Sequence, residues 1–132
     1  MTSPAFLSLA DESFVSLTTF RKSGEAVSTP VWIARDGDAL MVTTPADTGK
    51  VKRLRNNSRV ELRPSTRMGK VADDAPTLTG TAEVIEDQAV VERMGETFLA
   101  KYKLEYRIFL WIERRAKKGQ ARRYKLRITE AQ

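Results

Sequence analysis

Four cations occupy residues 50 to 55 of the chain: Lys50, Lys52, Arg53 and Arg55. They follow two hydroxyl-bearing residues and a glycine, namely Thr43, Thr44 and Gly49. Hydroxyl groups, the N–H groups at a helix start and basic side chains together form a typical phosphate site. The Walker pattern GxxxxGK[ST] is absent, so this is not a P-loop. A solvated surface helix is the alternative interpretation.

The same segment predicts a short helix from about 48 to 57, capped by Asp47 or Thr48, with Val51 and Leu54 on its inward face. We expect the cations to lie in its first turn. Positive charges there oppose the helix dipole, at a cost of about 0.3 kcal/mol or more each unless an anion is bound. The placement therefore favours an anionic ligand.

The composition limits the chemistry that the chain supplies by itself. It contains no histidine and no cysteine, which excludes Ser-His triads, disulfides and metal sites of the His/Cys kind. The net charge of +6, from 23 Lys+Arg and 17 Asp+Glu, favours an anionic partner. Neither a secretory signal nor a stretch long enough to span a membrane is recognisable, so we expect a cytoplasmic protein.

Alternating apolar residues and turn signals predict a single domain, residues 1–132, built mainly from antiparallel strands. The strands are expected at 13–20, 26–34, 39–44, 59–64, 77–86 and 121–129. Helices are expected at 87–104, with Asp87 as its cap, and at 105–119. Pro30 indicates that the second strand is an edge, carries a bulge, or is approached by something other than a strand. The pattern predicts an antiparallel β-barrel with helices as insertions.

The segments SLTTFRKSGEAVSTPVWIARDGDALMVTT and TGKVKRLRNNSRVEL, with KYKLEYR later, resemble the flavin/deazaflavin split-barrel superfamily. That superfamily holds the pyridoxamine 5'-phosphate oxidase-like proteins and the actinobacterial oxidoreductases that use coenzyme F420. The chain is more similar to the F420-dependent branch, because it ends in RRYKLRITEAQ and not in the oxidase's substrate-binding segment. The resemblance implies a six-stranded, homodimeric split β-barrel with cofactor sites across the dimer interface.

The resemblance also implies roles for particular residues. Lys50 and Arg53 would hold the cofactor phosphate, with hydroxyl contacts from Thr43 and Thr44. The tricyclic ring would be lined, partly through the backbone, by Ser28, Thr29, Pro30, Val31 and Trp32. Core packing is the alternative for Trp32.

A second group of residues is assigned less directly by the resemblance. Arg63, Thr66 and Arg67 would contact the cofactor tail or the substrate, or lie in an exposed loop. Tyr102, Tyr106 and Arg107 would reach the partner subunit's site or pack at the dimer interface. Relatives usually carry glycine where Lys103 stands, which leaves any site role of this turn open.

The expected function is that of an oxidoreductase that transfers a hydride between F420 and a small unsaturated or quinone-like substrate. The further cations suit the polyglutamate tail of F420: Lys52, Arg55, Arg63, Arg67 and Lys70. An FMN-dependent oxidase or reductase on the same fold and a non-catalytic flavin- or F420-binding protein are the alternatives. Nucleic-acid binding by the basic run 114–123 is disfavoured because aromatic residues are not interleaved with its cations. No metal is expected.

Overall fold

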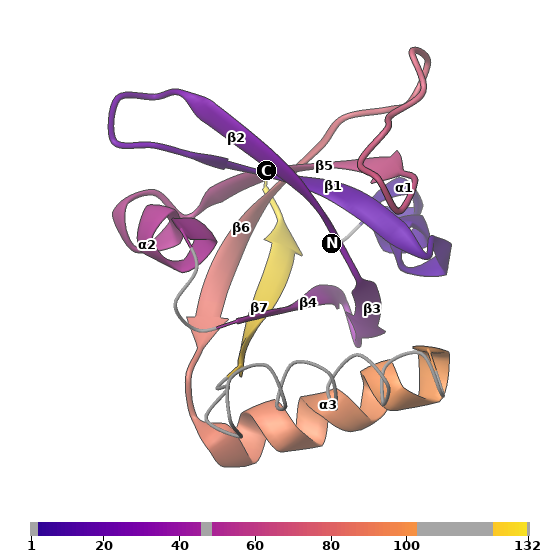
Figure 1. The fold of residues 1–132 in the computed structure, drawn as a ribbon. Helices are drawn as coiled ribbons and strands as arrows, with labels where there is room; N and C mark the ends of the chain where they lie inside the picture. The colour runs from indigo at the N-terminus through magenta and orange to yellow at the C-terminus, as the bar shows by residue number, and fades with distance from the viewer. Residues whose placement is uncertain (1–2, 46–48, 103–122, 132) are drawn as a thin grey trace.

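The protein forms one strongly curled antiparallel sheet with helices at its ends and along one side (Figure 1). The computed structural model describes residues 3–45, 49–102 and 123–131. Its strands are β1 Phe14–Phe20, β2 Ala26–Val31, β3 Ile33–Asp36, β4 Ala39–Pro45, β5 Arg59–Ser65, β6 Leu78–Ile85 and β7 Arg123–Glu130. The mainly β split barrel is confirmed, but the prediction of six strands was wrong: the expected strand 26–34 is two strands, because β2 pairs with β1 whereas β3 pairs with β4.

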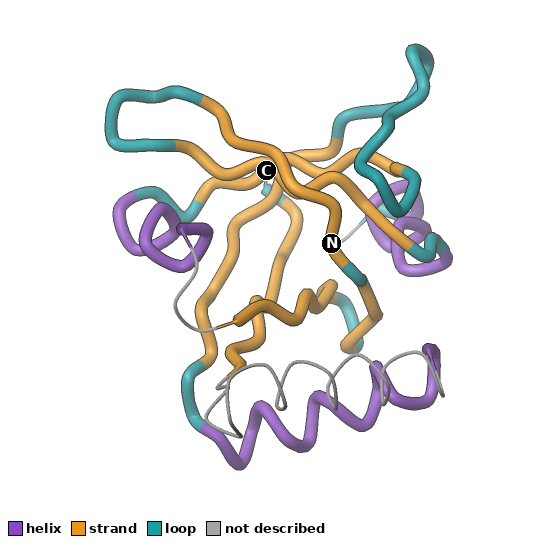
Figure 2. Tube along the Cα trace, in the orientation of Figure 1, coloured by secondary structure: helices purple, strands orange, loops and turns teal. Residues whose placement is uncertain are grey.

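The helices lie outside the sheet, as the tube in Figure 2 shows. They are α1 Pro4–Leu7, the 3₁₀-helix η1 Ser8–Asp11, α2 Gly49–Asn56 and α3 Gln88–Tyr102. Asp87 caps α3 as predicted, because its Oδ1 accepts from the Ala89 N–H at 2.9 Å. The expected caps of α2 and the helix at 105–119 lie outside the described residues. No helix in the described ranges is both long and apolar enough to cross a bilayer.

The strand order is β2-β1-β5-β6-β7-β4-β3, so the two edge strands follow each other directly in the chain. At Trp32 the chain leaves one edge of the sheet and joins the other. β3 pairs with β4 only from Ala39 to Val42, and no described strand pairs with that side of β4 beyond Val42. The outer edge of β2 likewise has no strand partner in the described sheet. A split therefore lies between β2 and the end of β4, with α2 following β4 at its open end (Figure 1).

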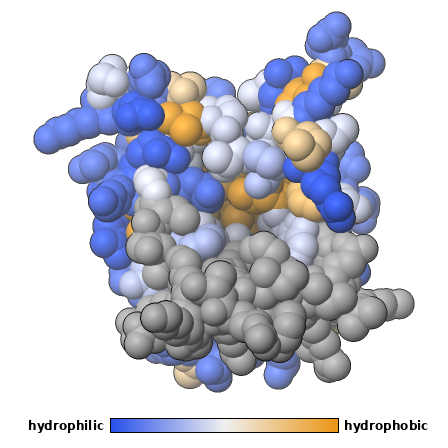
Figure 3. Space-filling model, in the orientation of Figure 1, coloured by the Kyte–Doolittle hydropathy of each residue, from blue (hydrophilic) through white to orange (hydrophobic). Residues whose placement is uncertain are grey.

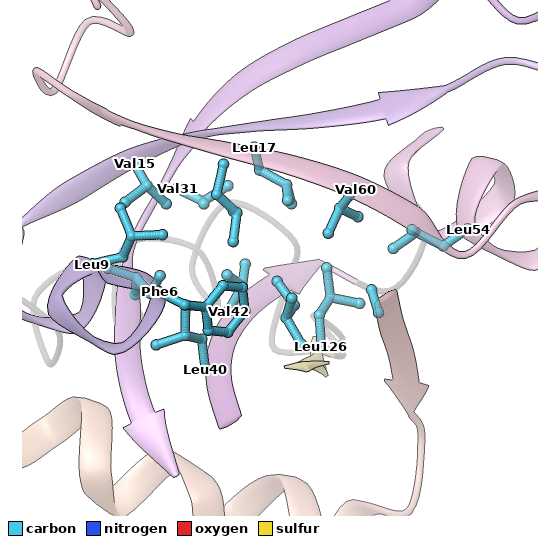
Figure 4. Packing of buried hydrophobic residues seen from close by; sticks show 14 residues of the cluster. Phe6, Leu9, Val15, Leu17, Val31, Leu40, Val42, Leu54, Val60 and Leu126 are labelled. Atoms are coloured by element: carbon cyan, nitrogen blue, oxygen red, sulfur yellow. The ribbon is translucent and has the colours of Figure 1, made fainter. Parts of the chain in front are cut away.

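Two hydrophobic clusters hold the sheet. The larger one fills the barrel interior and includes Phe6 and Leu9 from the N-terminal helices (Figure 4). The smaller one lies between the sheet and α3 and is centred on Met41 and Phe98. Strand alternation explains the division, because neighbouring β4 residues point to opposite faces.

Pro30 lies on the edge strand, as one of the sequence alternatives predicted. The Arg21 N–H donates to the Glu25 carbonyl at 2.8 Å at the end of the β1–β2 hairpin. Because bonded and non-bonded pairs alternate along an antiparallel ladder, the Ser16–Pro30 pair is a non-bonded one. The ring nitrogen of Pro30 therefore faces the free edge, where the ladder needs no N–H.

Candidate functional site

The short helix α2 places its cations on two sides of a buried stripe. Val51 and Leu54 are buried, and the helix packs against β1 and β6. Arg53 extends to the β1 side, where its Nε donates to the Thr19 hydroxyl oxygen at 2.6 Å. Arg55 extends to the β6 side and forms a 3.1 Å ion pair with Glu86. Only the β1 side borders the split.

The expectation that all four cations lie in the first turn of α2 was wrong. The helix begins at Gly49, so Arg53 and Arg55 belong to its last turn, where positive charge is favourable. The guanidinium of Arg53 nevertheless reaches back to the helix start. A Cβ added at Gly49 would lie 2.6 Å from Nη1 of Arg53. The side chain thus carries its charge to the positive end of the helix dipole, because helical side chains lean toward the N-terminus.

The guanidinium of Arg53 has donors to spare. Within the described parts of the chain, its only side-chain hydrogen bond is the one from Nε to Thr19. Lys50 lies three residues earlier, on the same side of the helix, and is half-buried. The two predicted phosphate-binding residues are therefore brought together at the start of α2.

Thr43 and Thr44 are both buried, but their hydroxyls lie on opposite faces of β4. The Thr43 hydroxyl oxygen accepts from the Lys125 ammonium at 2.9 Å. Lys125 lies on the α3 side of the sheet, with its Nζ 5.1 Å from the centre of the Phe98 ring. Thr44 follows Leu40 and Val42 on the barrel-facing side of β4. Of the two hydroxyls, only that of Thr44 lies on the face that borders the interior of the split.

The predicted ring-lining residues of β2 alternate between the two faces of the sheet. Thr29 and Val31 face inward, opposite Leu17 and Val15 of β1. The Thr29 hydroxyl oxygen is buried, and no hydrogen-bond partner for it lies among the described residues. Leaving such a group unpaired costs about 1–3 kcal/mol. A ligand that bonded this hydroxyl would recover that free energy.

Ser28 and Pro30 are exposed on the outer face of β2. The Ser28 hydroxyl lies 2.7 Å from the Thr18 hydroxyl. Because their side chains are on the outer face, Ser28 and Pro30 border the split through their backbones. Trp32 is half-buried and packs against the cluster beneath α3. Its placement agrees with core packing, the alternative to ring contact.

Arg63 and Thr66 lie apart from α2, on the outer face of the sheet. Arg63 is opposite Ser16, and its Nη2 donates to the Ala75 carbonyl at 2.9 Å. Its Nε is buried and finds no partner in the part of the chain that the structure describes. The Thr66 hydroxyl accepts from the Lys70 N–H at 3.1 Å and orders a turn in the loop that follows β5. Arg63 thus holds this loop against the sheet, while its assigned contact with the cofactor tail stays a prediction.

Two residues of this region were missed by the sequence analysis. Thr19 looked like an interior strand residue, and only the position of α2 shows its bond to Arg53. Lys125 was not singled out by the sequence, yet it is 1% exposed because α3 covers it. Tyr106 and Arg107 lie outside the described residues.

An open pocket of about 590 Å³ lies elsewhere, between the N-terminal helices, β3 and α3. None of the predicted site residues lines it. Its lysine, Lys101, donates to the carbonyls of Ala10, Glu12 and Ile33 at 2.5–2.6 Å. Burial lowers the pKa of Lys101, and the nearby Asp11 and Glu12 oppose that shift. All three N–H donors of the Lys101 ammonium are bonded to backbone carbonyls, so they are not available to a ligand in this pocket.

The site at α2 can be compared with known proteins. The family profile described as pyridoxamine 5'-phosphate oxidase matches residues 5–132. The chain belongs to the pyridoxamine 5'-phosphate oxidase family. No curated protein matches it.

Solved structures share the fold of this family member at low sequence identity. A conserved hypothetical protein from Mycobacterium tuberculosis is 20% identical, with a TM-score of 0.68 over 100% of this chain and 82% of that one. An F420 reductase is 16% identical, with a TM-score of 0.57 over 99% and 97% of the two chains. The heme storage protein from Vibrio cholerae is 14% identical, with a TM-score of 0.63 over 100% and 92%. These likenesses show the fold alone.

Proposed function

We propose that this protein binds coenzyme F420 in the split between β2 and β4, and transfers a hydride between it and a small unsaturated or quinone-like substrate. The observation that carries the proposal is the position of the Arg53 guanidinium. It lies over Gly49, at the helix end where a cation is unfavourable, and it keeps unused donors there. A bound phosphate would turn both features into favourable interactions.

The residues around the split fit such a group. Lys50 and Arg53 would hold the phosphate, and Thr44 would add a hydroxyl from the end of β4. The free backbone edge of β2 would border the flat ring, and the unpaired hydroxyl of Thr29 supports a ligand on this side. When bound and reduced, the coenzyme supplies the hydride, and a proton completes the reduction of the substrate. With no histidine or cysteine in the chain, the protein contributes binding and orientation.

Some observations favour F420 as the coenzyme, and one favours FMN. The net charge of +6 and the likeness to an F420 reductase over nearly the whole of both chains favour F420. Two cations expected to hold its tail, Arg55 and Arg63, already have partners within the chain. That observation favours FMN, which ends at a single phosphate, as the second candidate. A homodimer with sites at the subunit interface is proposed for either coenzyme.

Tryptophan fluorescence titrations with F420, FMN and riboflavin test the proposal. FMN differs from riboflavin by its phosphate, so the parent is expected to bind FMN more tightly. Arg53→Ala should weaken FMN binding by about 1.5–3 kcal/mol, the scale of charged hydrogen bonds, and leave riboflavin binding unchanged. Arg55→Ala is the matched control: it removes the same charge from α2 on the side turned to Glu86. Equal losses in both variants, or none in either, would contradict the phosphate assignment.

Turnover is tested separately from binding. Reduced F420, or reduced FMN, is mixed with a quinone such as menadione under anaerobic conditions, with and without the protein. Oxidation that depends on both the protein and the quinone supports an oxidoreductase. Tight coenzyme binding with no such acceleration across a panel of quinones and enones would favour a non-catalytic binding protein.

A further inference from the structure

Two residues hold the Arg53 side chain in its folded-back position. Thr19, near the end of β1, is fully buried, and its hydroxyl oxygen accepts from Nε of Arg53 at 2.6 Å. At the other end of the guanidinium, Gly49 leaves the space that Nη1 occupies. The atoms closest to a Cβ at Gly49 all belong to this guanidinium: Nη1 at 2.6 Å, Cζ at 3.5 Å and Nη2 at 3.7 Å.

These contacts have a common consequence. A free arginine side chain loses rotamer freedom when it binds an anion, and its planar fork must be aligned with the anion's oxygens. The bond at Nε fixes the plane of the guanidinium, and the missing Cβ lets that plane lie across the helix start. Nη1 and Nη2 keep their donors, because no acceptor for them lies in the described ranges.

We infer that Thr19 and Gly49 are positioning residues that align the fork of Arg53 before the coenzyme phosphate binds. The inference rests on the proposed function, because it concerns the phosphate-binding side chain of that site. Neither residue touches the coenzyme in this account. Thr19 acts through the Arg53 Nε, and Gly49 acts by leaving space for Nη1.

Substitutions of Thr19 and Gly49 should disturb the Arg53 guanidinium in different ways. Thr19→Val keeps the shape of the side chain but removes the acceptor, so it loosens the guanidinium. Gly49→Ala favours the helix, because alanine has the higher helix propensity. It also forces Nη1 to move, because Nη1 would lie 2.6 Å from the new Cβ. A purely structural role for Gly49 predicts that the alanine variant is harmless to binding.

The experiment compares FMN and riboflavin affinities of the parent, Thr19→Val, Thr19→Ser and Gly49→Ala. Thr19→Val is expected to weaken FMN binding about fivefold to tenfold, with riboflavin binding unchanged and near-parental affinity in Thr19→Ser. Gly49→Ala is expected to give a similar loss with no drop in Tm. In an Arg53→Ala background, Thr19→Val should cause no further loss, because the side chain that it aligns is gone. Thr81→Val, an exposed site on β6, controls for the substitution itself.

A second measurement needs no coenzyme. The NMR signal of the Arg53 Nε–H can be assigned by its loss in Arg53→Lys. This proton should exchange slowly with water in the parent and rapidly in Thr19→Val. A parent that binds neither F420 nor FMN would overturn the proposed function. A parent that binds FMN, with Thr19→Val and Gly49→Ala binding it equally well, would overturn the positioning role alone. Should Thr19→Val fail to fold, Gly49→Ala and the exchange rate in the parent decide the question.

Discussion

Thr43 and Thr44 are adjacent in β4 and both buried, but their side chains serve opposite faces of the sheet. Thr43 accepts a hydrogen bond from Lys125 beneath α3, whereas Thr44 faces the barrel interior near the split. The Thr44 hydroxyl donates to the carbonyl of the next residue, Pro45, at 3.4 Å. The pair therefore places one hydroxyl beneath α3 and the other on the face of β4 that borders the split.

Replacing each threonine by valine should give opposite results. Thr43→Val removes an acceptor from the buried ammonium of Lys125 and should lower the free energy of unfolding by about 1.5–3 kcal/mol, with coenzyme affinity unchanged. Thr44→Val should weaken coenzyme binding about fivefold. Urea unfolding and FMN titration measure the two quantities. A loss of affinity in Thr43→Val alone would place the phosphate on the other face of β4.

Acid should weaken the link between the chain's N-terminal region and β7. The Ser3 hydroxyl and N–H donate to the Glu130 carboxylate at 2.7 and 2.6 Å, and they hold the pKa of Glu130 below its ordinary value of 4.5. The folded state thus binds this proton less readily than the unfolded state, so the stabilisation is present above pH 4.5 and is lost as the pH falls through the lower, folded-state pKa. Glu130→Gln should be less stable than the parent at pH 7.

Urea unfolding of both proteins from pH 7 to pH 3 checks this prediction. The difference in unfolding free energy between parent and Glu130→Gln should shrink on the acid side. A difference that stays constant down to pH 3 would show that the Ser3 contacts do not shift this carboxyl group.

The loop after β5 should open when Arg63 is replaced. Arg63→Met removes the bond to the Ala75 carbonyl, but it also removes a buried nitrogen without a partner. The two effects oppose each other, so global stability should change by less than about 1 kcal/mol. Trypsin should cleave the native variant faster than the parent at Arg67 and Lys70, since both lie in the loop that Arg63 holds. Arg59→Met is the control, because Arg59 bonds Glu61 on its own strand; unchanged cleavage in Arg63→Met would contradict the clamp.

Much of the sheet was predictable because strand alternation follows burial. The break between β2 and β3 was not, since Val31 and Ile33 flank Trp32 without a turn residue and the chain changes partner strands there. The N-terminal helix had a usable signal: Ser3 followed by Pro4 is a common helix start, and Ser3 does cap α1. Local sequence shows which residues alternate, but not which strand they meet.

The placement of Lys50 and Arg53 on one side of α2 was predictable from the sequence. Their spacing indicates one side of a helix, but not that the Arg53 guanidinium would return to Gly49. That position depends on Thr19, which is 34 residues away in the chain. The burial of Lys125 likewise depends on α3, which no local pattern around the lysine reveals. Tertiary neighbours, and not residue types, determine these features.

The edge orientation of Pro30 affects whether the open edge of β2 can pair with a strand of another molecule. An exposed strand normally invites a strand from another molecule to pair with it, which leads to sheet-to-sheet aggregation. Pro30 presents no N–H to that edge, so an incoming strand would lack a ladder bond near the end of β2. Pro30 thus makes this edge of the sheet a poor template for a second polypeptide.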